Sequence, residues 1–362
     1  MCGIAGFIDY TKKADKATLK LITDKLSHRG PDDSGFFFEQ NRTCNIGLGH
    51  RRLSVIDLSH NGHQPMFFND LAIIFNGEIY NFKEIQHELF RLGYSFQSES
   101  DTEVIIKAFH AWGANMLKRF IGMFAIVIYD KKANKVWCFR DRAGVKPFFY
   151  SWNNGVLLFS SELKSIISFP NFSKKLNDDA VLQYTCIGYI PAPNTIFKNV
   201  YKLKPGTFIC IDLISKQIDK ECYWDIVDFA NRPKLDISYE ESKRQLEDLF
   251  RSAFNYRLVS DVKTGLFFSG GYDSTAVASI LQANSSDKLK TFTIGFNDKE
   301  FDESVHAKKI ARIIGTDHHE FICSEHDALA VIDQLPEIFD EPISDNSCIP
   351  TYLLSKLTRN EV

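Results

Sequence analysis

Apolar and polar positions in the first two hundred residues follow two periods. Continuous apolar runs at 2–8, 71–75, 123–129 and 135–140 predict short strands, and we expect the run at 71–75 to stop at Asn76-Gly77. Apolar residues spaced three or four apart predict helices around Leu19–Leu26, Phe82–Leu89 and 104–109. The polar segment 130–134 is short enough to join its two flanking strands as a hairpin. Strands that lie close together in sequence favour antiparallel sheets with helices packed on them.

The pattern changes near residue 225. Residues 225–238 are polar, contain Pro233 and show no period, which predicts a linker; a helix with apolar residues between Leu246 and Phe254 follows. Strand and helix patterns then alternate at 262–268, 274–281, 291–296 and 305–314, as in a parallel sheet. We divide the chain into a first domain at 2–210, a linker at 211–238 and a second domain at 239–362. Three strands are few for such a sheet, so we expect the chain to be a fragment of a longer protein.

Composition and charge exclude several classes of protein. Apolar residues make up 44% of the chain, charged residues 25%, and the formal net charge is −3. This balance is typical of globular proteins and predicts no nucleic-acid partner. No apolar run approaches the ~18 residues that a membrane span needs, so we also expect no membrane partner. The eight cysteines form no CxxC pair and no signal peptide precedes them, which favours a reducing cytoplasm.

Two histidine pairs were considered as metal ligands. The pairs are His60 with His63 and His318 with His319. No cysteine or carboxylate stands at ligand spacing beside them, so the sequence predicts no protein-bound zinc.

Cys2 directly follows the initiator methionine. Removal of Met1 would place a thiol and a free α-amino group on one residue, and such an amine has a pKa of ~7.7–8.0. A nucleophile activated by its own terminal amine is an established catalytic arrangement. Taken alone, Cys2 is better explained as a chance residue at a start codon.

Further segments favour the catalytic interpretation. They are His28-Arg29-Gly30-Pro31-Asp32, Arg51-Arg52-Leu53-Ser54, Asn76-Gly77-Glu78-Ile79-Tyr80-Asn81 and Ser100-Asp101-Thr102-Glu103. Together with the start Met1-Cys2-Gly3-Ile4-Ala5-Gly6, they resemble the ordered motifs of class II glutamine amidotransferases, which use an N-terminal nucleophile. The resemblance covers roughly the first 210 residues and implies an α+β fold, an αββα sandwich of antiparallel sheets.

The resemblance assigns each motif a task in binding and cleaving glutamine. Free glutamine is a zwitterion, so Arg52 would bind its carboxylate and Asp101 its ammonium group. Leu53 and Glu78 would belong to the same binding site. Cys2 would attack the side-chain amide, with the oxyanion held by the Asn76 side chain and the Gly77 N–H. Simpler interpretations remain, in which Arg52 is a surface charge and Asp101 caps a helix over 102–111.

A second cluster lies between a predicted strand and the helix expected from Ser274. Its residues are Ser269-Gly270-Gly271-Tyr272-Asp273-Ser274, and a glycine-rich turn at a helix start can present N–H groups to phosphate. The two glycines alone would fit a plain tight turn. All six residues resemble the pyrophosphate loop of ATP pyrophosphatases, an α/β parallel-sheet fold. This resemblance implies ATP contacts from the loop, from a following strand and from Asp273 near Mg²⁺-pyrophosphate; the residues are Phe268, Ser269, Gly270, Gly271, Asp273, Ser274 and, for adenine, Ile294.

The two resemblances together point to the glutamine-hydrolysing asparagine synthetases. That family implies glutamine, aspartate and ATP as substrates, Mg²⁺ as cofactor, and transfer of ammonia to an aspartyl-adenylate; a homodimer stays open. The family's later Ser-Gly-x-Gly-x-Asp-Glu loop is absent, so we expect the ATP-pyrophosphatase domain to be incomplete. Two alternatives remain: a related ATP-dependent amidotransferase acting on a sugar acid or another carboxylate, and a non-catalytic binding or regulatory remnant.

Overall fold

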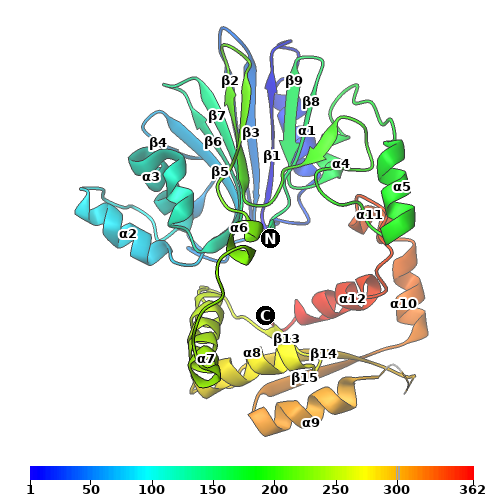
Figure 1. The fold of residues 1–362 in the computed structure, drawn as a ribbon. Coiled ribbons are helices and arrows are strands. Elements are labelled where there is room, and N and C mark those ends of the chain that lie inside the picture. Colours follow the sequence, from blue (N-terminus) through cyan, green and yellow to red (C-terminus); the bar gives the residue numbers. More distant parts are fainter. Residues whose placement is uncertain (299, 301) are drawn as a thin grey trace. The chain divides into compact units, whose positions relative to one another are not determined.

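The computed structural model describes residues 1–362 except 299 and 301. The chain divides into two compact units (Figure 1). The first comprises Met1–Arg232 together with Asp340–Ile343, and the second comprises Pro233–Phe339 and Ser344–Val362. The predicted boundary at residue 210 therefore differs from the structure, because 211–232 belong to the first unit.

Two antiparallel sheets form the centre of the first unit. One has the strand order β10 (Val200–Lys202), β8 (Phe149–Asn153), β9 (Val156–Ser160), β1 (Gly3–Asp9), β3 (Asn45–Arg52), β2 (Asp33–Gln40). The other has the order β12 (Ile218–Cys222), β11 (Thr207–Asp212), β7 (Lys135–Arg140), β6 (Gly122–Asp130), β5 (Leu71–Ile79), β4 (Met66–Phe68). Strands β11 and β12 explain why the unit extends past residue 210: they complete the edge of this sheet.

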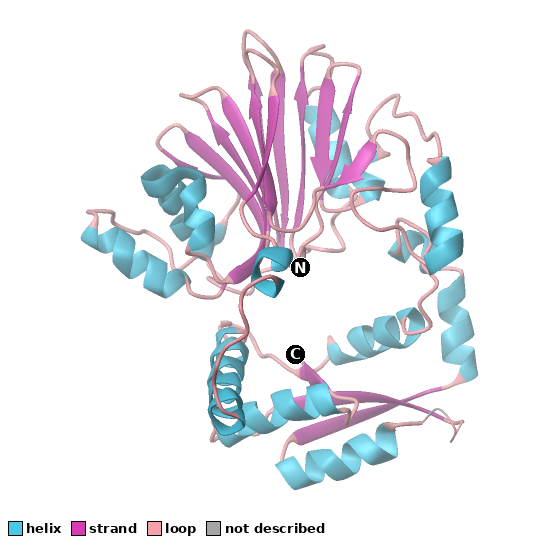
Figure 2. Cartoon of the chain, in the orientation of Figure 1, coloured by secondary structure: helices cyan, strands magenta, loops and turns pink. Residues whose placement is uncertain are grey.

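The two sheets face each other across an apolar core. Ile4 and Ile8 of β1, Ile74 of β5 and Val127 of β6 are all fully buried in it. A second apolar cluster joins β1 to the helices α1 (Lys16–Asp24) and α4 (Leu163–Ile166), while α3 (Asp101–Trp112) packs on β5 and β4. Strands inside and helices outside are visible in Figure 2. The predicted αββα sandwich is confirmed.

The first unit contains further helices. They are the 3-10 helices η1 (His60–Gly62) and η2 (Gly113–Lys118), and the α-helices α2 (Phe82–Arg91), α5 (Asp178–Ile187) and α6 (Ile226–Ala230).

One strand prediction was wrong in its end point. Strand β5 does not stop at Asn76-Gly77 but continues to Ile79, because β6 pairs with it in register along its whole length. Asn76 lies opposite Ala125 and Gly77 opposite Phe124. A Cβ on Gly77 would come within 2.1 Å of the Met123 carbonyl oxygen, so glycine is required there by the neighbouring strand. The pair Asn76-Gly77 is thus held rigidly in a sheet.

The second unit contains a parallel sheet, as predicted. Its order is β13 (Leu266–Phe267), β14 (Lys290–Phe296), β15 (Asp317–Cys323). The helices are α7 (Tyr239–Tyr256), α8 (Tyr272–Ala283), α9 (Ser304–Ile314), α10 (Glu325–Ile332), α11 (Leu335–Ile338) and α12 (Cys348–Thr358). Helix α8 begins two residues before the predicted Ser274, and the apolar face of α7 stays largely exposed, with Leu249 at 66%. No helix in the described part of the chain is long and apolar enough to cross a membrane.

Candidate active site

Strand pairing brings Cys2 next to the segment Arg51–Leu53. Gly3 at the start of β1 lies opposite Arg51 of β3, so Cys2 reaches the end of that strand. The Leu53 N–H lies 3.4 Å from the Cys2 Sγ, and the thiol lies 3.6 Å from the Leu53 carbonyl oxygen. Burial raises the pKa of the Cys2 thiol, and the Leu53 N–H opposes that shift. The sulfur therefore rests as a thiol and needs a base before it can act as a nucleophile.

The segment 28–32 holds the main chain of Cys2 in place. Arg29 donates from Nε to the Cys2 carbonyl oxygen at 2.8 Å and pairs through Nη1 with Glu162 at 2.8 Å. Gly30 packs against the strand beside it, since a Cβ there would come within 2.3 Å of the Arg51 carbonyl carbon. The second motif thus positions the nucleophile.

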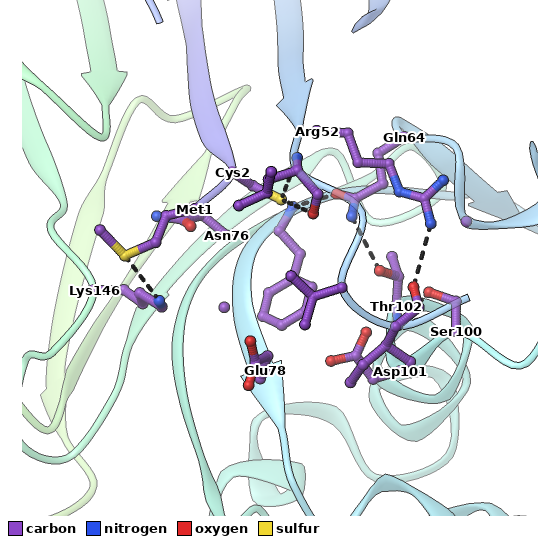
Figure 3. Close-up of a pocket in the computed structure, with 16 residues that line it drawn as sticks. Met1, Cys2, Arg52, Gln64, Asn76, Glu78, Ser100, Asp101, Thr102 and Lys146 are labelled. Atoms are coloured by element: carbon purple, nitrogen blue, oxygen red, sulfur yellow. Dashed lines mark hydrogen bonds between the residues drawn. The ribbon is translucent and has the colours of Figure 1, made fainter. Parts of the chain in front are cut away.

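Cys2 opens into a cavity of about 90 Å³ (Figure 3). Every residue predicted for the glutamine site lines this cavity: Cys2, Arg52, Leu53, Asn76, Gly77, Glu78 and Asp101. The sequence did not single out several other lining residues, among them Gln64 and Lys146.

Asn76 has the most unusual environment of these residues. Its side chain is completely buried, yet neither its amide nitrogen nor its amide oxygen has a hydrogen-bond partner among the residues that the structure describes. Buried polar groups are nearly always paired, so an unpaired amide facing a cavity indicates a ligand-binding group. Gly77 lines the cavity beside it.

Arg52 supplies a fixed cation at the same cavity. It is buried, and its guanidinium donates to the carbonyls of Ser59 at 2.9 Å, Ile56 at 3.3 Å and Asp57. A guanidinium has five N–H donors, so these carbonyls fix its plane and leave donors for a ligand. Gly62 completes the arrangement, because a Cβ there would lie 1.9 Å from Arg52 Nη2.

Asp101 and Glu78 supply carboxyl groups. Asp101 accepts from the Ile79 N–H at 3.0 Å, and burial, with Glu78 nearby, raises its pKa to about 7. Burial also raises the pKa of Glu78. The alternative in which Asp101 caps the helix is wrong: Asp101 is its first residue, and Ser100 is the cap, accepting from the Thr102 N–H at 3.2 Å.

Gln64 ties the elements of the site together. Its Oε1 accepts from the Phe75 N–H at 2.6 Å and its Nε2 donates to Thr102 Oγ1 at 3.0 Å, so it bridges β5 and α3. No local pattern in the polar segment around Gln64 pointed to this role.

The histidine pair His60 and His63 does have a carboxylate neighbour. Asp33 lies close to both, with ligand atoms of the three residues within 4.8 Å of one another. The sequence-based exclusion missed Asp33 because β2 delivers it from about thirty positions away. His63 Nδ1 and Asp33 Oδ2 are hydrogen-bonded at 2.7 Å.

In the second unit, the predicted phosphate loop forms the turn before α8. The Ser269 hydroxyl accepts from the Gly271 N–H at 3.2 Å, and the Ser274 hydroxyl donates to the Gly271 carbonyl at 3.2 Å. Gly270 has a left-handed φ of +78°, which favours glycine. Asp273 lies in the first turn of α8.

Beside this turn lies a second cavity, of about 890 Å³. Of the predicted nucleotide residues, Phe268, Ser269 and Ile294 line it, whereas Gly270, Gly271, Asp273 and Ser274 do not. Much of its wall is apolar, with Phe292, Phe296 and Leu354 among the lining residues. The acidic residues Asp298, Glu303 and Glu325 also line it.

Comparisons with known proteins agree with this arrangement of two sites. Residues 1–224 match the family described as a glutamine amidotransferase domain, and residues 245–362 match the family described as asparagine synthase. The chain is 39% identical, over its whole length and 72% of the relative, to a putative glutamine-hydrolysing asparagine synthetase 2 of Methanocaldococcus jannaschii. It is 32% identical to asparagine synthetase 1 of Bacillus subtilis, again over its whole length but over 56% of that relative.

A solved structure of glutamine phosphoribosylpyrophosphate amidotransferase from B. subtilis also resembles the chain. The TM-score is 0.46 at 14% identity, covering 89% of this chain and 81% of the other.

Proposed function

Because the chain belongs to the family of glutamine-hydrolysing asparagine synthetases, we propose that its first unit hydrolyses glutamine and that the ammonia serves an ATP-dependent amidation. One observation supports the glutaminase step: Cys2, the unpaired amide of Asn76, Arg52 and Asp101 all line the same cavity. A cation, an anion, a nucleophile and an oxyanion donor in one cavity match a zwitterionic amide substrate.

Arg52 and Asp101 would fix the two ends of the glutamine backbone. The guanidinium binds the α-carboxylate, and the Asp101 carboxylate, with Glu78 beside it, accepts from the α-ammonium group. With both charged groups held, the side-chain amide extends to Cys2. This accounts for the burial of both residues at the cavity wall.

The covalent step needs a base, and the terminal amine of Cys2 would supply it once Met1 is removed. The thiol proton moves to the amine, the sulfur bonds to the amide carbon, and the carbonyl electron pair moves onto oxygen. Asn76 Nδ2 and the Gly77 N–H stabilise that oxyanion. Its collapse breaks the C–N bond, and ammonia leaves with the proton from the amine. Water, deprotonated by the same amine, then cleaves the thioester to glutamate.

The second unit would bind ATP at the turn before α8. The N–H groups of the turn and the positive end of the helix dipole hold the phosphates, and Ile294 contacts adenine. Asp273, in the first turn of α8, would offer an oxygen donor of the kind that Mg²⁺ prefers. Mg²⁺ supplies charge neutralisation of the phosphates. The acceptor would be the β-carboxylate of aspartate, activated as an adenylate with release of pyrophosphate; ammonia then displaces AMP to give asparagine.

A cytoplasmic location fits the eight cysteines, all of which are free in the structure. Light scattering would show whether the protein assembles as a homodimer.

The test of the glutaminase step compares two cysteine variants. Cys2→Ala should lower glutamate release by about 10⁴-fold or more, because the nucleophile is lost. Cys186→Ala, which changes an exposed cysteine, should leave the rate unchanged. The wild type should show a glutamine-derived thioester by mass, with Met1 absent. Full glutamate release by Cys2→Ala would refute the proposal.

The acceptor is tested separately, by pyrophosphate release. In the full-length protein, aspartate should stimulate release above every other carboxylic acid in a panel that includes sugar acids. Stimulation by a different acid would assign the protein to the related amidotransferases instead.

A further inference from the structure

Lys146 is a buried cation that the proposed reaction leaves without a task. Only 3% of its surface is exposed, and it lines the same cavity as Cys2. In Figure 3, Lys146 and Met1 lie on one side of Cys2, opposite Arg52 and Gln64. Lysine is rarely this buried without a paired anion, so its position needs an explanation.

The loop between β7 and β8 holds the main chain of Lys146 rigidly. The Asp141 carboxylate accepts from the N–H groups of Val145 at 2.9 Å and of Lys146 at 2.9 Å. Arg140 Nε donates to the Lys146 carbonyl at 2.9 Å. Both main-chain polar groups of Lys146 are therefore fixed, and its side chain contacts Met1 at the chain terminus.

No carboxylate neutralises the Lys146 ammonium directly. Among the described residues, none places a carboxylate oxygen within 4.0 Å of it, and its one hydrogen-bond partner is the Met1 thioether sulfur at 3.2 Å. Asp141 is the acidic residue closest to Lys146 in the sequence, and its carboxylate accepts hydrogen bonds from main-chain N–H groups. The neighbouring cation Arg29 is paired with Glu162. The groups that interact with Lys146 electrostatically are Glu78, Arg29, Cys2 and Asp141.

While Met1 is present, the terminal amine experiences the same cations: burial lowers the pKa of the Met1 amine to about 6, Cys2 and Glu78 oppose this shift, and Arg29 and Lys146 add to it. Removal of Met1 would place the amine on Cys2, which lines the same cavity as Lys146. Arg29 is paired with Glu162, whereas no described carboxylate forms an ion pair with Lys146.

We propose that Lys146 is a positioning residue of the glutaminase site, whose fixed positive charge keeps the terminal amine neutral and stabilises negative charge on the Cys2 sulfur. The inference rests on the proposed glutaminase function. A cation disfavours protonation of a neighbouring amine and favours a neighbouring thiolate, so one charge assists both partners in the proton transfer. Lys146 itself neither gains nor loses a proton in the reaction.

The test is the pH profile of kcat/KM for glutamine in the full chain. In Lys146→Met the amine should hold its proton to higher pH, so the acid limb should move up by about one pH unit. Activity should fall about tenfold on that limb and recover at high pH. Lys146→Arg, which keeps the charge, should restore most of the wild-type profile. Arg142→Met, which removes a cation from the same loop away from the cavity, should match the wild type.

A second measurement keeps the proposal testable if one variant folds poorly. The pH dependence of Cys2 alkylation by iodoacetamide should shift in the same direction in Lys146→Met and in Lys146→Gln. An equal loss of kcat/KM at every pH, or an unshifted alkylation profile, would overturn the proposal, because a merely structural lysine gives those results. If the wild type itself releases no glutamate through Cys2, the proposed function fails first.

Discussion

The two candidate sites differ in which part of the chain meets the ligand. The cavity of the first unit is walled by buried side chains that carry charge or unpaired polar atoms, Arg52, Asn76, Asp101 and Lys146. In the second unit, the phosphate-binding groups proposed are main-chain N–H groups of an exposed turn, next to a cavity with a largely apolar wall.

This difference has a physical origin. Cleaving an amide requires donors and charges aimed at single atoms, and such groups gain strength when they are buried and fixed beforehand. Holding a phosphate requires several N–H donors around one anion, which a helix start provides without any particular side chain. Substitutions of side chains should therefore be costly in the first site, and substitutions that move the backbone should be costly in the second.

Among changes that keep the nucleophile, the largest effect expected is on turnover in Asn76→Ala. The buried amide has no partner in the structure, so its loss should cost little stability but should lower kcat for glutamine by about 100- to 1000-fold. Asn81→Ala is the matched control. That amide is also buried but fully paired, to the Arg119 carbonyl at 3.0 Å and the Ile121 N–H at 2.9 Å.

Asn81→Ala should therefore give the reverse pattern. It should lower the free energy of unfolding by about 1–3 kcal/mol and leave kcat close to that of the wild type. Thermal melts and glutamate release on both variants provide the measurement. If Asn76→Ala were the less stable variant with normal kcat, the contrast between a substrate-binding and a structural amide would fail.

Arg52→Lys should raise KM for glutamine by roughly tenfold with a smaller change in kcat. The charge remains, but the planar pair of donors is lost, and the carboxylate is bound alike in the ground and transition states. Arg51→Lys is the control, since Arg51 pairs with Asp24 and does not line the cavity. An equal rise in KM for both variants would show that charge near β3, and not the Arg52 contact, governs glutamine binding.

The residues that the sequence assigned to the first site all line one cavity, and each lies in a short motif that local sequence reveals. Cys2 precedes β1, Arg52 ends β3, Asn76 lies within β5 and Asp101 begins α3. The sequence did not show which other strands would pair with these segments. The extension of β5 past Asn76 depends on β6, which no local pattern reveals.

Residues that act on these motifs from a distance could not be predicted for the same reason. Glu162 reaches Arg29 across 133 positions, and Lys146 reaches the terminus across 145. In the second unit, the alternation of strand and helix patterns predicted the parallel sheet, and the glycine-rich cluster predicted the turn. These patterns did not give the exposure of α7, because a helical period shows which face is apolar and not whether that face is covered.

In the second site, Gly270→Ala should weaken ATP binding by about fivefold. Its φ is +78° and a Cβ would lie 3.0 Å from the Ala307 Cα, so alanine should distort the turn at a cost of about 1 kcal/mol. Gly315→Ala carries the same left-handed strain at the end of α9, with φ +88° and no atom near its Cβ. Titration calorimetry with Mg²⁺-ATP should find weakened binding only in Gly270→Ala; equal affinities would mean that the turn does not hold the phosphates.

The smallest effect expected is the pH dependence of KM for glutamine. The pKa of Asp101 is raised to about 7, so the carboxylate is ionised at pH 8 and increasingly protonated below pH 7. Only the ionised form attracts the substrate ammonium, so KM should rise as pH falls, by about fourfold between pH 8 and pH 6.5. Asp101→Asn should have a high KM with no such dependence, whereas Glu99→Gln, a neutralised exposed neighbour, should keep it. If the dependence persists in Asp101→Asn, then Glu78, whose pKa burial also raises, is the carboxyl group that binds the ammonium.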